Sequence, residues 1–364
     1  MLKTLANYNL TGGFNPSLAE LFTFGAMIST TDTVTILAVL EAKRVDPHLF
    51  YLVFGESAMN DAVGLVLFNA FSKQVGFDDA GDPHAIMLSC LNIVLDFMTI
   101  FVGSFLWGAL SGLFAGLLLK WIDMRANRLL ELSLFILVMY FPFLLAEVLG
   151  LSGIVTIFFS GMSAKQYATP NLSAATENDA DAIFRVTAFL AETIIFLELG
   201  LSVFGIPDFE HNHFVFTFWA LLASLIGRAM GVYPVSFLFN RMYKQMRKIL
   251  FDDYHAHDPV AAISREKPYI PDLKITWTNC HMLWLSGLRG AVAYACAKNF
   301  PKDNGNRSAF VFTTIFIVLF TVFVMGGTTE CALKSLNVSM YVDEEEYMKT
   351  HGKWITKGWF YEIG

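Results

Sequence analysis

An Asn60-Asp61 pair inside a long apolar stretch is the feature of this sequence best suited to chemistry. The stretch, residues 50–71, reads FYLVFGESAMNDAVGLVLFNAF. As a helix, which rises about 1.5 Å per residue, it is long enough to cross a bilayer. A carboxylate at mid-membrane depth is energetically costly and is usually retained because ions or protons must pass it. We therefore expect Asp61 to bind a proton or a cation.

Two more polar interruptions occur in apolar segments, one in each half of the chain. Residues 29–33 read STTDT, and residues 286–290 read SGLRG. Hydroxyl groups can satisfy backbone groups that unwinding frees, and glycines weaken a helix. Asp32 is expected to offset the positive N-terminal end of a half-helix, and Arg289 the negative C-terminal end of the opposing one. Such paired broken spans are typical of secondary transporters built from inverted repeats.

Further charged residues lie in apolar surroundings, where each needs a partner. Arg228, in LIGRAMGVYP, is the expected partner of Glu56, which makes that ion pair structural. Glu192 is expected to help compensate Arg289. For Glu192 and for Glu198, which lies six residues later, we favour a structural role over a functional one.

Each of these features also has a purely structural interpretation. Asp61 could be tied to an arginine or a lysine, and the hydroxyls of residues 29–33 could bond back to carbonyls of an intact helix. The glycines of residues 286–290 could form a close-packing face. The coincidence of all three features in one chain favours the functional interpretation.

Composition indicates a membrane protein and argues against several other classes. Apolar residues make up 55% of the chain and charged residues only 16%, whereas soluble domains carry about 25% charged residues. The four cysteines are scattered without CxxC spacing, so neither a metal centre nor a disulfide framework is indicated. No enzyme motif occurs in its required context, and no nucleic-acid patch is visible. We expect a protein of the bilayer with no resident cofactor and no enzymatic activity.

About nine apolar windows qualify as membrane spans. They cover residues 18–40, 50–71, 91–119, 129–148, 151–164, 184–206, 213–238, 277–298 and 308–334. The fifth window is short and rich in small residues, so we expect it to be buried against neighbouring helices. No cleavable signal is recognisable at the N-terminus.

Loop charges predict the orientation of these spans. Lysines and arginines concentrate on one side, above all in the expected loop 239–276, and the opposite side has few. By the positive-inside rule the basic side is cytosolic. The acidic tail from Tyr341 lies on the same side. The predicted domains are a membrane transport domain over residues 1–335 and a short cytosolic tail over residues 336–364.

Six motifs, which follow one another along nearly the whole chain, carry a family resemblance. They read FGAMISTTDTVTILAVL, LVFGESAMNDAVGLVLF, LSGIVTIFFSGM, AETIIFLELGLSVF, IGRAMGV and SGLRGAVAYA. The chain thereby resembles the eukaryotic sodium/proton exchangers of the monovalent cation/proton antiporter family. Stretches such as KWIDMRANRLLE and FRVTAFLAET resemble the Golgi and endosomal branch, closest to isoform 8.

The resemblance implies a fold of about thirteen helices in inverted repeats, working as a homodimer with an elevator-like core. The family's Asn-Asp motif falls on Asn60-Asp61, so Asp61 would bind cation and proton in turn. Thr31 and Asp32 match the first broken helix, and Arg289 matches the second. Asn60 stands where electrogenic relatives have a second Asp. This implies a single carboxylate and an electroneutral exchange of one cation for one proton.

The resemblance extends to the Glu56 and Arg228 ion pair, but the chain departs from the family pattern elsewhere. Thr33 follows Asp32 where the family usually has proline, so unwinding is less firmly enforced. Glu198 stands where an apolar or aromatic residue is expected. The nine windows align with the family's fifth to thirteenth helices, so about four N-terminal helices are expected to be absent.

The sequence therefore predicts an antiporter that exchanges Na⁺ or K⁺ for protons, with the cation bound transiently at Asp61. A Golgi or endosomal membrane is favoured and the plasma membrane is possible, with the lipid bilayer as surroundings and a homodimer if the full-length protein is present. A transport-dead fragment that modulates a full-length exchanger stays open as an alternative. A cation channel is a further one.

Overall fold

The chain is described by a computed structural model over residues 2–3, 14, 16–75, 83–122, 124–125, 127–204, 214–257, 274–301 and 306–342. Every regular element in these ranges is a helix, which confirms the predicted all-α class. Seven helical segments are long and apolar enough to cross a membrane. The two remaining windows correspond to one short helix and to a second segment that is broken in the middle. The expected nine-span pattern is thus present as helices.

The first broken segment consists of α2 (Leu18–Ser29) and α3 (Val34–Ala42). Hydroxyl groups stabilise its interruption locally. The Ser29 and Thr30 side chains donate to the carbonyls of Ala26 and Met27 at 2.6 and 2.9 Å, which satisfies groups that lose their helical partners where α2 ends. The break therefore forms without the proline of the family pattern.

One long helix, α4 (Pro47–Ser72), follows this break and carries the Asn60-Asp61 pair. It begins at Asp46, whose side chain accepts a hydrogen bond from the His48 amide at 3.1 Å. Pro47 occupies the first helical position, where a missing N–H costs nothing. α4 packs closely against α2 because Gly64 leaves room: a Cβ there would lie only 2.5 Å from Thr30 Cγ2.

The next four helices form a bundle of their own. They are α5 (Pro83–Trp121), α6 (Arg128–Val148), α7 (Gly153–Tyr167) and α8 (Ala174–Phe204). Glycines on α5 allow α7 to approach closely, since a Cβ on Gly108 would lie 2.5 Å from the Thr156 carbonyl oxygen. The predicted packing of the short fifth window against its neighbours is confirmed, because α7 contacts both α5 and α6.

The remaining elements build the second half of the fold. They are α9 (Phe214–His257), α11 (Trp277–Leu285), α12 (Ala291–Lys298), α13 (Arg307–Phe320), the π-helical segment η3 (Thr321–Gly326) and α14 (Gly327–Ser335). The second predicted break falls between α11 and α12. The prediction that a loop begins at residue 239 is wrong, because α9 continues to His257. Residues such as Arg, Met, Lys and Gln in this stretch are good helix formers.

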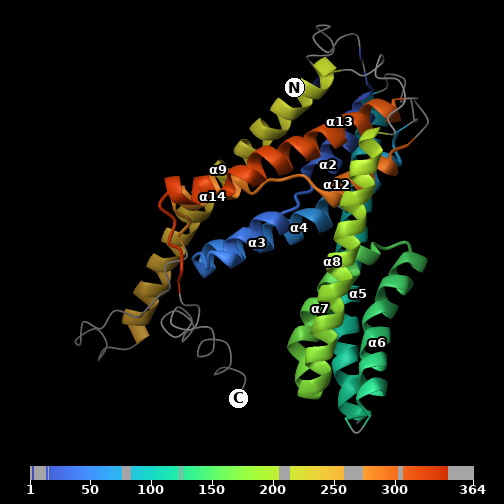
Figure 1. The fold of residues 1–364 in the computed structure, drawn as a ribbon, viewed down its shortest axis with the longest axis vertical. Coiled ribbons are helices and arrows are strands. Elements are labelled where there is room, and N and C mark those ends of the chain that lie inside the picture. Colours follow the sequence, from blue (N-terminus) through green and yellow to red (C-terminus); the bar gives the residue numbers. More distant parts are fainter. Residues whose placement is uncertain are drawn as a thin grey trace.

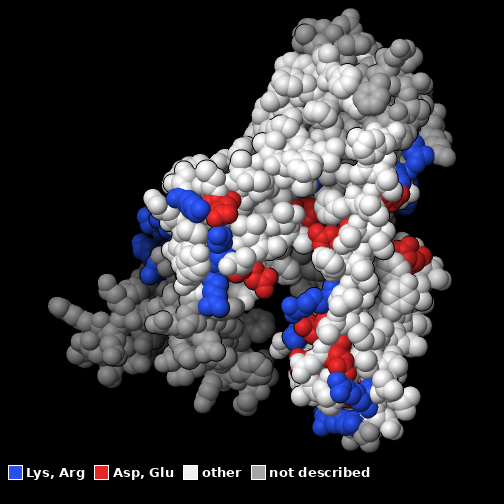
Figure 2. Space-filling view, in the orientation of Figure 1, with Lys and Arg blue, Asp and Glu red and all other residues white. Residues whose placement is uncertain are grey.

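The bundle of α5–α8 stands to one side of the other helices (Figure 1). Its principal contacts with them run from α5 to α4 and from α8 to α12. Figure 2 shows a face that is largely uncharged, with lysines, arginines and acids gathered in a few groups. Many large apolar side chains are exposed along the bundle, among them Phe114, Leu137 and Leu190. Such an extended apolar surface is the surface a bilayer covers.

Candidate functional site

The two broken segments cross, and a backbone hydrogen bond joins their unwound parts. The Asp32 amide donates to the Leu288 carbonyl at 2.9 Å. The Asp32 carboxylate accepts from the Val34 amide at 3.1 Å and from the Ala291 amide at 3.4 Å. It thus lies at the N-terminal ends of both α3 and α12, where the helix dipoles favour a negative charge. The expected compensation of a half-helix by Asp32 is present at two helices instead of one.

Gly290 makes this approach possible. A Cβ at Gly290 would collide with the side-chain atoms of Asp32. The glycine in the second break is therefore required by the carboxylate of the first.

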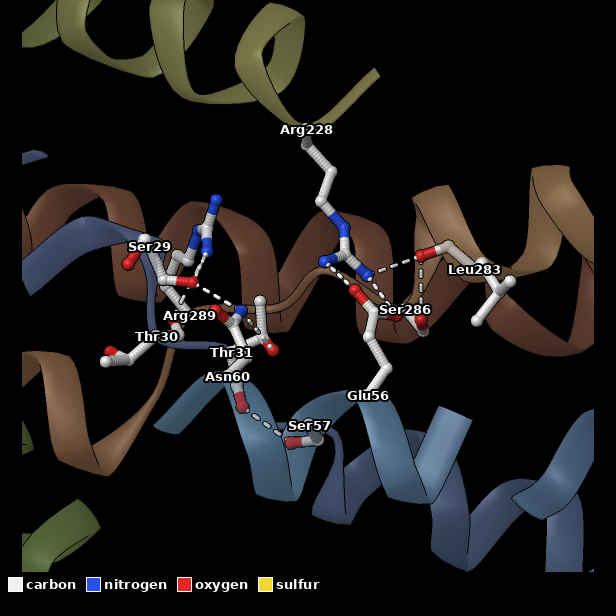
Figure 3. A network of polar contacts seen from close by, with 10 residues as sticks. All are labelled: Ser29, Thr30, Thr31, Glu56, Ser57, Asn60, Arg228, Leu283, Ser286 and Arg289. Carbon is white, nitrogen blue, oxygen red and sulfur yellow. Dashed lines mark hydrogen bonds and ion pairs between the residues drawn. The ribbon is translucent and has the colours of Figure 1, made fainter. Parts of the chain in front are cut away.

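Arg289 is the counterpart of Asp32 at the opposite polarity. Only 5% of the residue is exposed. One guanidinium nitrogen donates to the carbonyls of Ser29 at 2.8 Å and Thr30 at 3.2 Å, at the end of α2 (Figure 3). A cation at a helix C-terminus is favoured by the dipole and by the free carbonyls there. The Arg289 amide also donates to the Thr321 hydroxyl at 3.1 Å, so the π-helical segment helps to hold the break.

Asn60 fastens α4 to the first break. Its amide nitrogen donates to the Ser29 carbonyl at 2.6 Å and to the Thr31 hydroxyl at 3.1 Å, and one turn earlier the Ser57 hydroxyl donates to the Thr31 carbonyl at 2.7 Å. Figure 3 shows Asn60, Thr31 and Arg289 converging on the unwound end of α2. The polar groups of this break are therefore held by both α4 and the second break.

Asp61 differs from its neighbour. Its Oδ1 atom is buried and has no hydrogen-bond partner among the described residues. A buried carboxylate oxygen in this state is costly unless a proton or a cation occupies it. The hydroxyl and carbonyl oxygens of the break are, like a carboxylate, hard oxygen ligands of the kind that hard cations prefer.

The expected Glu56 and Arg228 ion pair is present next to this site. It is bidentate, with Arg228 Nη1 and Nη2 bonded to the two carboxylate oxygens of Glu56, and Nη2 also donates to the Leu283 carbonyl at 2.7 Å. The pair ties α4 to α9 and to the end of α11. Gly287 leaves room for it, since a Cβ there would lie 2.5 Å from Arg228 Nε. Its assignment as structural stays a prediction.

A cavity of about 660 Å³ opens beside the crossing. Ser29, Asn60 and Arg289 line one part of it, and Glu56 and Arg228 line another. Its remaining lining is largely apolar and includes small residues of α9. The cavity therefore reaches the neighbour of Asp61 and the ends of both broken helices.

The structure thus brings together most of the predicted site residues. Thr31, Asp32, Asn60 and Arg289 meet at the crossing, with Asp61 on the same helix as Asn60. No ion pair joins Glu192 to Arg289 in the part of the chain that the structure describes. Compensation of Arg289 by Glu192 stays a prediction.

Sequence reasoning missed several polar partners. It did not single out Ser57 or Thr321, whose hydroxyls hold the two breaks. It also left Glu198 unexplained, whereas the structure pairs Glu198 with Lys298 at the end of α12. The sequence does contain a signal for this pair, because a lysine ends one apolar span and an unpaired acid lies within another.

Comparisons with known proteins identify a family whose members are similar to this chain. Residues 3–335 match the family model described as sodium/hydrogen exchanger, transmembrane. Sodium/hydrogen exchanger 9 of Rattus norvegicus is 35% identical over 327 residues, which is 90% of this chain and 46% of that protein. Sodium/hydrogen exchanger 8 of Homo sapiens is also 35% identical, over 88% of this chain and 50% of that protein. The chain spans about half the length of the curated relatives it matches.

A solved structure supports the fold. The sodium proton antiporter MjNhaP1 from Methanocaldococcus jannaschii aligns with a TM-score of 0.62 at 17% identity, covering 92% of this chain and 75% of that one. These relatives are transporters and not enzymes. On the match over residues 3–335, this multi-pass membrane chain belongs to the sodium/hydrogen exchanger family.

Proposed function

We propose that this chain exchanges one Na⁺ or K⁺ for one proton, without net charge movement, at the carboxylate of Asp61. The observation that carries the proposal is the buried Oδ1 of Asp61, which lacks a hydrogen-bond partner beside two crossed broken helices. A proton or a cation each supplies the charge that this oxygen needs, and the two compete for it. Competition at one carboxylate supports a ratio of one to one.

The surrounding residues support the exchange by keeping the rest of the site compensated. Hydrogen bonds at two helix N-termini stabilise the charge of Asp32, and the carbonyls at the end of α2 stabilise the charge of Arg289. Glu56 is neutralised by Arg228. Asn60 at the position next to Asp61 adds a donor and no second charge. Binding or release at Asp61 then changes the site by one charge only.

Alternating access couples the two ions. A site whose carboxylate carries a proton or a cation is neutral and crosses a low-dielectric barrier at lower cost than the bare carboxylate. Movement of the empty site is thereby suppressed, and each crossing carries one ion. In an acidic Golgi or endosomal lumen, this exchange releases protons to the cytosol and takes up cytosolic cation.

Location and assembly belong to the same proposal. Relatives named sodium/hydrogen exchanger 8 and 9 match this chain, and the family resemblance supports an endomembrane site. The lysines and arginines near the C-terminal end of α9 support a cytosolic C-terminus. The full-length protein is proposed to act as a homodimer in the bilayer.

A second candidate is a fragment that modulates a full-length exchanger without transporting ions itself. The observation that favours it is coverage, because the chain corresponds to about half of its curated relatives. A cation channel is the least favoured candidate. Paired broken helices are typical of transporters, and a channel would carry measurable current.

The test is proton flux in proteoliposomes that contain the chain as given, driven by a Na⁺ or K⁺ gradient with the voltage clamped. The proposal predicts flux that is insensitive to voltage, lost in Asp61→Asn and partly kept in Asp61→Glu. Asp181→Asn is the matched control, since Asp181 is an exposed residue that pairs with Arg185 on α8. Full flux in Asp61→Asn would refute the proposal. No flux from the chain alone, together with a changed flux of a full-length exchanger reconstituted with it, supports the modulating fragment instead.

A further inference from the structure

The structure contains a polar contact between its two parts that the exchange site does not use. It joins α8, in the bundle of α5–α8, to α12, the second half of the second broken segment. Lys298 forms an ion pair with Glu198, and the Tyr294 and Ser202 hydroxyls are hydrogen-bonded to each other. Both contacts lie between the same two helices, one turn apart on each.

The partners on α12 are positioned by their own surroundings. Tyr294 is 1% exposed and packs with Leu199 of α8 in a buried apolar cluster. The Lys298 ammonium lies 5.2 Å from the centre of the Tyr294 ring, within the range of a cation–π contact. Arg307 also donates to the Lys298 carbonyl, which holds the end of α12. The ion pair is therefore presented by an ordered helix end.

This contact lies where the α5–α8 bundle meets the crossed helices. The bundle meets the rest of the described chain mainly where α5 contacts α4 and where α8 contacts α12. α12 starts directly after the crossing, at Ala291, and ends at Lys298. A displacement of α12 along or away from α8 therefore pulls Glu198 and Lys298 apart.

We propose that Glu198 and Lys298 form a latch that holds the second broken helix against the α5–α8 bundle and opens once in every transport cycle. The latch rests on the proposed exchange function. Both side chains are about half exposed, with fractions of 50% and 42%, so the pair is weak enough to open repeatedly. Lys298 and Glu198 act as positioning residues, because neither contacts the exchange site.

Charge reversal tests the latch through kinetics. Glu198→Lys or Lys298→Glu replaces attraction with repulsion and raises the maximal transport rate about two- to fivefold, with the KM for cation unchanged. The double variant Glu198→Lys with Lys298→Glu restores the wild-type rate. The matched control is the ion pair of Lys165 with Glu177, which joins α7 to α8 inside the bundle, and its reversal leaves the rate unchanged.

Cross-linking tests the latch without depending on natural transport rates. In Glu198→Cys with Lys298→Cys, a short bis-methanethiosulfonate linker, which forms a disulfide with each cysteine and releases methanesulfinate, stops flux, and reduction restores it. The same reagent leaves flux through either single variant unchanged. Normal flux through the cross-linked protein, or single reversals without effect, would overturn the proposal.

Failure of the proposed function is distinguishable from failure of the latch. If the chain carries no flux, the rate of cross-linking in the double cysteine variant is compared at one alkaline pH with and without saturating Na⁺, so that thiol reactivity is the same in both. The latch predicts different rates, because the site neutralised by Na⁺ moves more readily than the bare carboxylate. Equal rates, with Lys165→Cys and Glu177→Cys as the reference pair, would overturn it.

Discussion

Asn60 and Asp61 are consecutive residues on α4, but their polar groups are in opposite states. The Asn60 amide nitrogen donates two hydrogen bonds to the first break, at 2.6 and 3.1 Å, whereas Asp61 Oδ1 is buried without a partner among the described residues. Asn60 thus fastens the helix, and Asp61 leaves a buried carboxylate oxygen unpaired. Substitution of Asn60 therefore tests how α4 is held against the break, whereas substitution of Asp61 tests the proposed binding of ions.

Asn60→Ala removes both hydrogen bonds from the break. Each is worth about 1 kcal/mol, so the melting temperature in detergent falls and the transport rate drops because the end of α2 is less constrained. The control is Asn69→Ala, an exposed position on the same helix. Unchanged melting and unchanged transport in Asn60→Ala would contradict the assigned role.

Removing one partner of the Glu56 and Arg228 pair is expected to cost more than removing both. Arg228 has only 9% of its side chain exposed, and an unpaired buried charge destabilises by about 3 kcal/mol. Arg228→Met and Glu56→Gln each lower the melting temperature strongly, and the double variant recovers part of the loss. A double-mutant cycle by thermal unfolding measures this, and simple additivity of the two losses would disprove the coupling.

Gly290→Ala is expected to disrupt the crossing. The added methyl group collides with the Asp32 side chain, so either the carboxylate leaves the two helix N-termini or the segments separate. Transport is lost and the protein is less stable. Gly327→Ala serves as control, since nothing lies within 4 Å of a Cβ there. Tolerance of both substitutions would show that the crossing is looser than described.

Glu131→Gln is expected to lower the stability of the protein without changing its affinity for the cation. Glu131 is a buried acid, but it accepts from the Ser173 amide at 2.9 Å and from the hydroxyls of Ser173 and Thr176 at 2.6 Å each. The change weakens the start of α8 by about 2 kcal/mol and leaves the cation KM of the folded protein unchanged. Titration of transport against cation concentration, beside thermal unfolding, checks this. A shifted KM would mean that Glu131 takes part in ion binding.

Much of the fold could be predicted from the sequence, because apolar windows of membrane length and interrupted spans are local signals. The breaks at residues 29–33 and 286–290 were predicted, and so was the partnership of Glu56 with Arg228. Arg289 was expected at the end of a half-helix, where it lies. The predicted roles of these residues in transport stay predictions.

The partners of the other intramembrane acids could not be predicted, because they are set by tertiary contacts. Glu147 accepts from the Gly153 amide at 2.9 Å at the start of α7, and Glu198 pairs with a residue one hundred positions away. The apolar windows show that such acids lie within spans, but they do not show which backbone amide or lysine each acid bonds to. The continuation of α9 beyond residue 238 was missed because a charged helix in water resembles a loop by hydropathy.

Asp32 makes the two breaks dependent on each other. Its amide bonds to Leu288, and its carboxylate reaches Ala291 as well as Val34, so neither interruption keeps its hydrogen bonds if the other rewinds. Genetic interactions follow from this geometry. Suppressors of a damaging substitution within residues 30–33 should map to residues 286–290, more than 250 positions away. A substitution that becomes fixed in one break therefore limits which residues the other break tolerates during evolution.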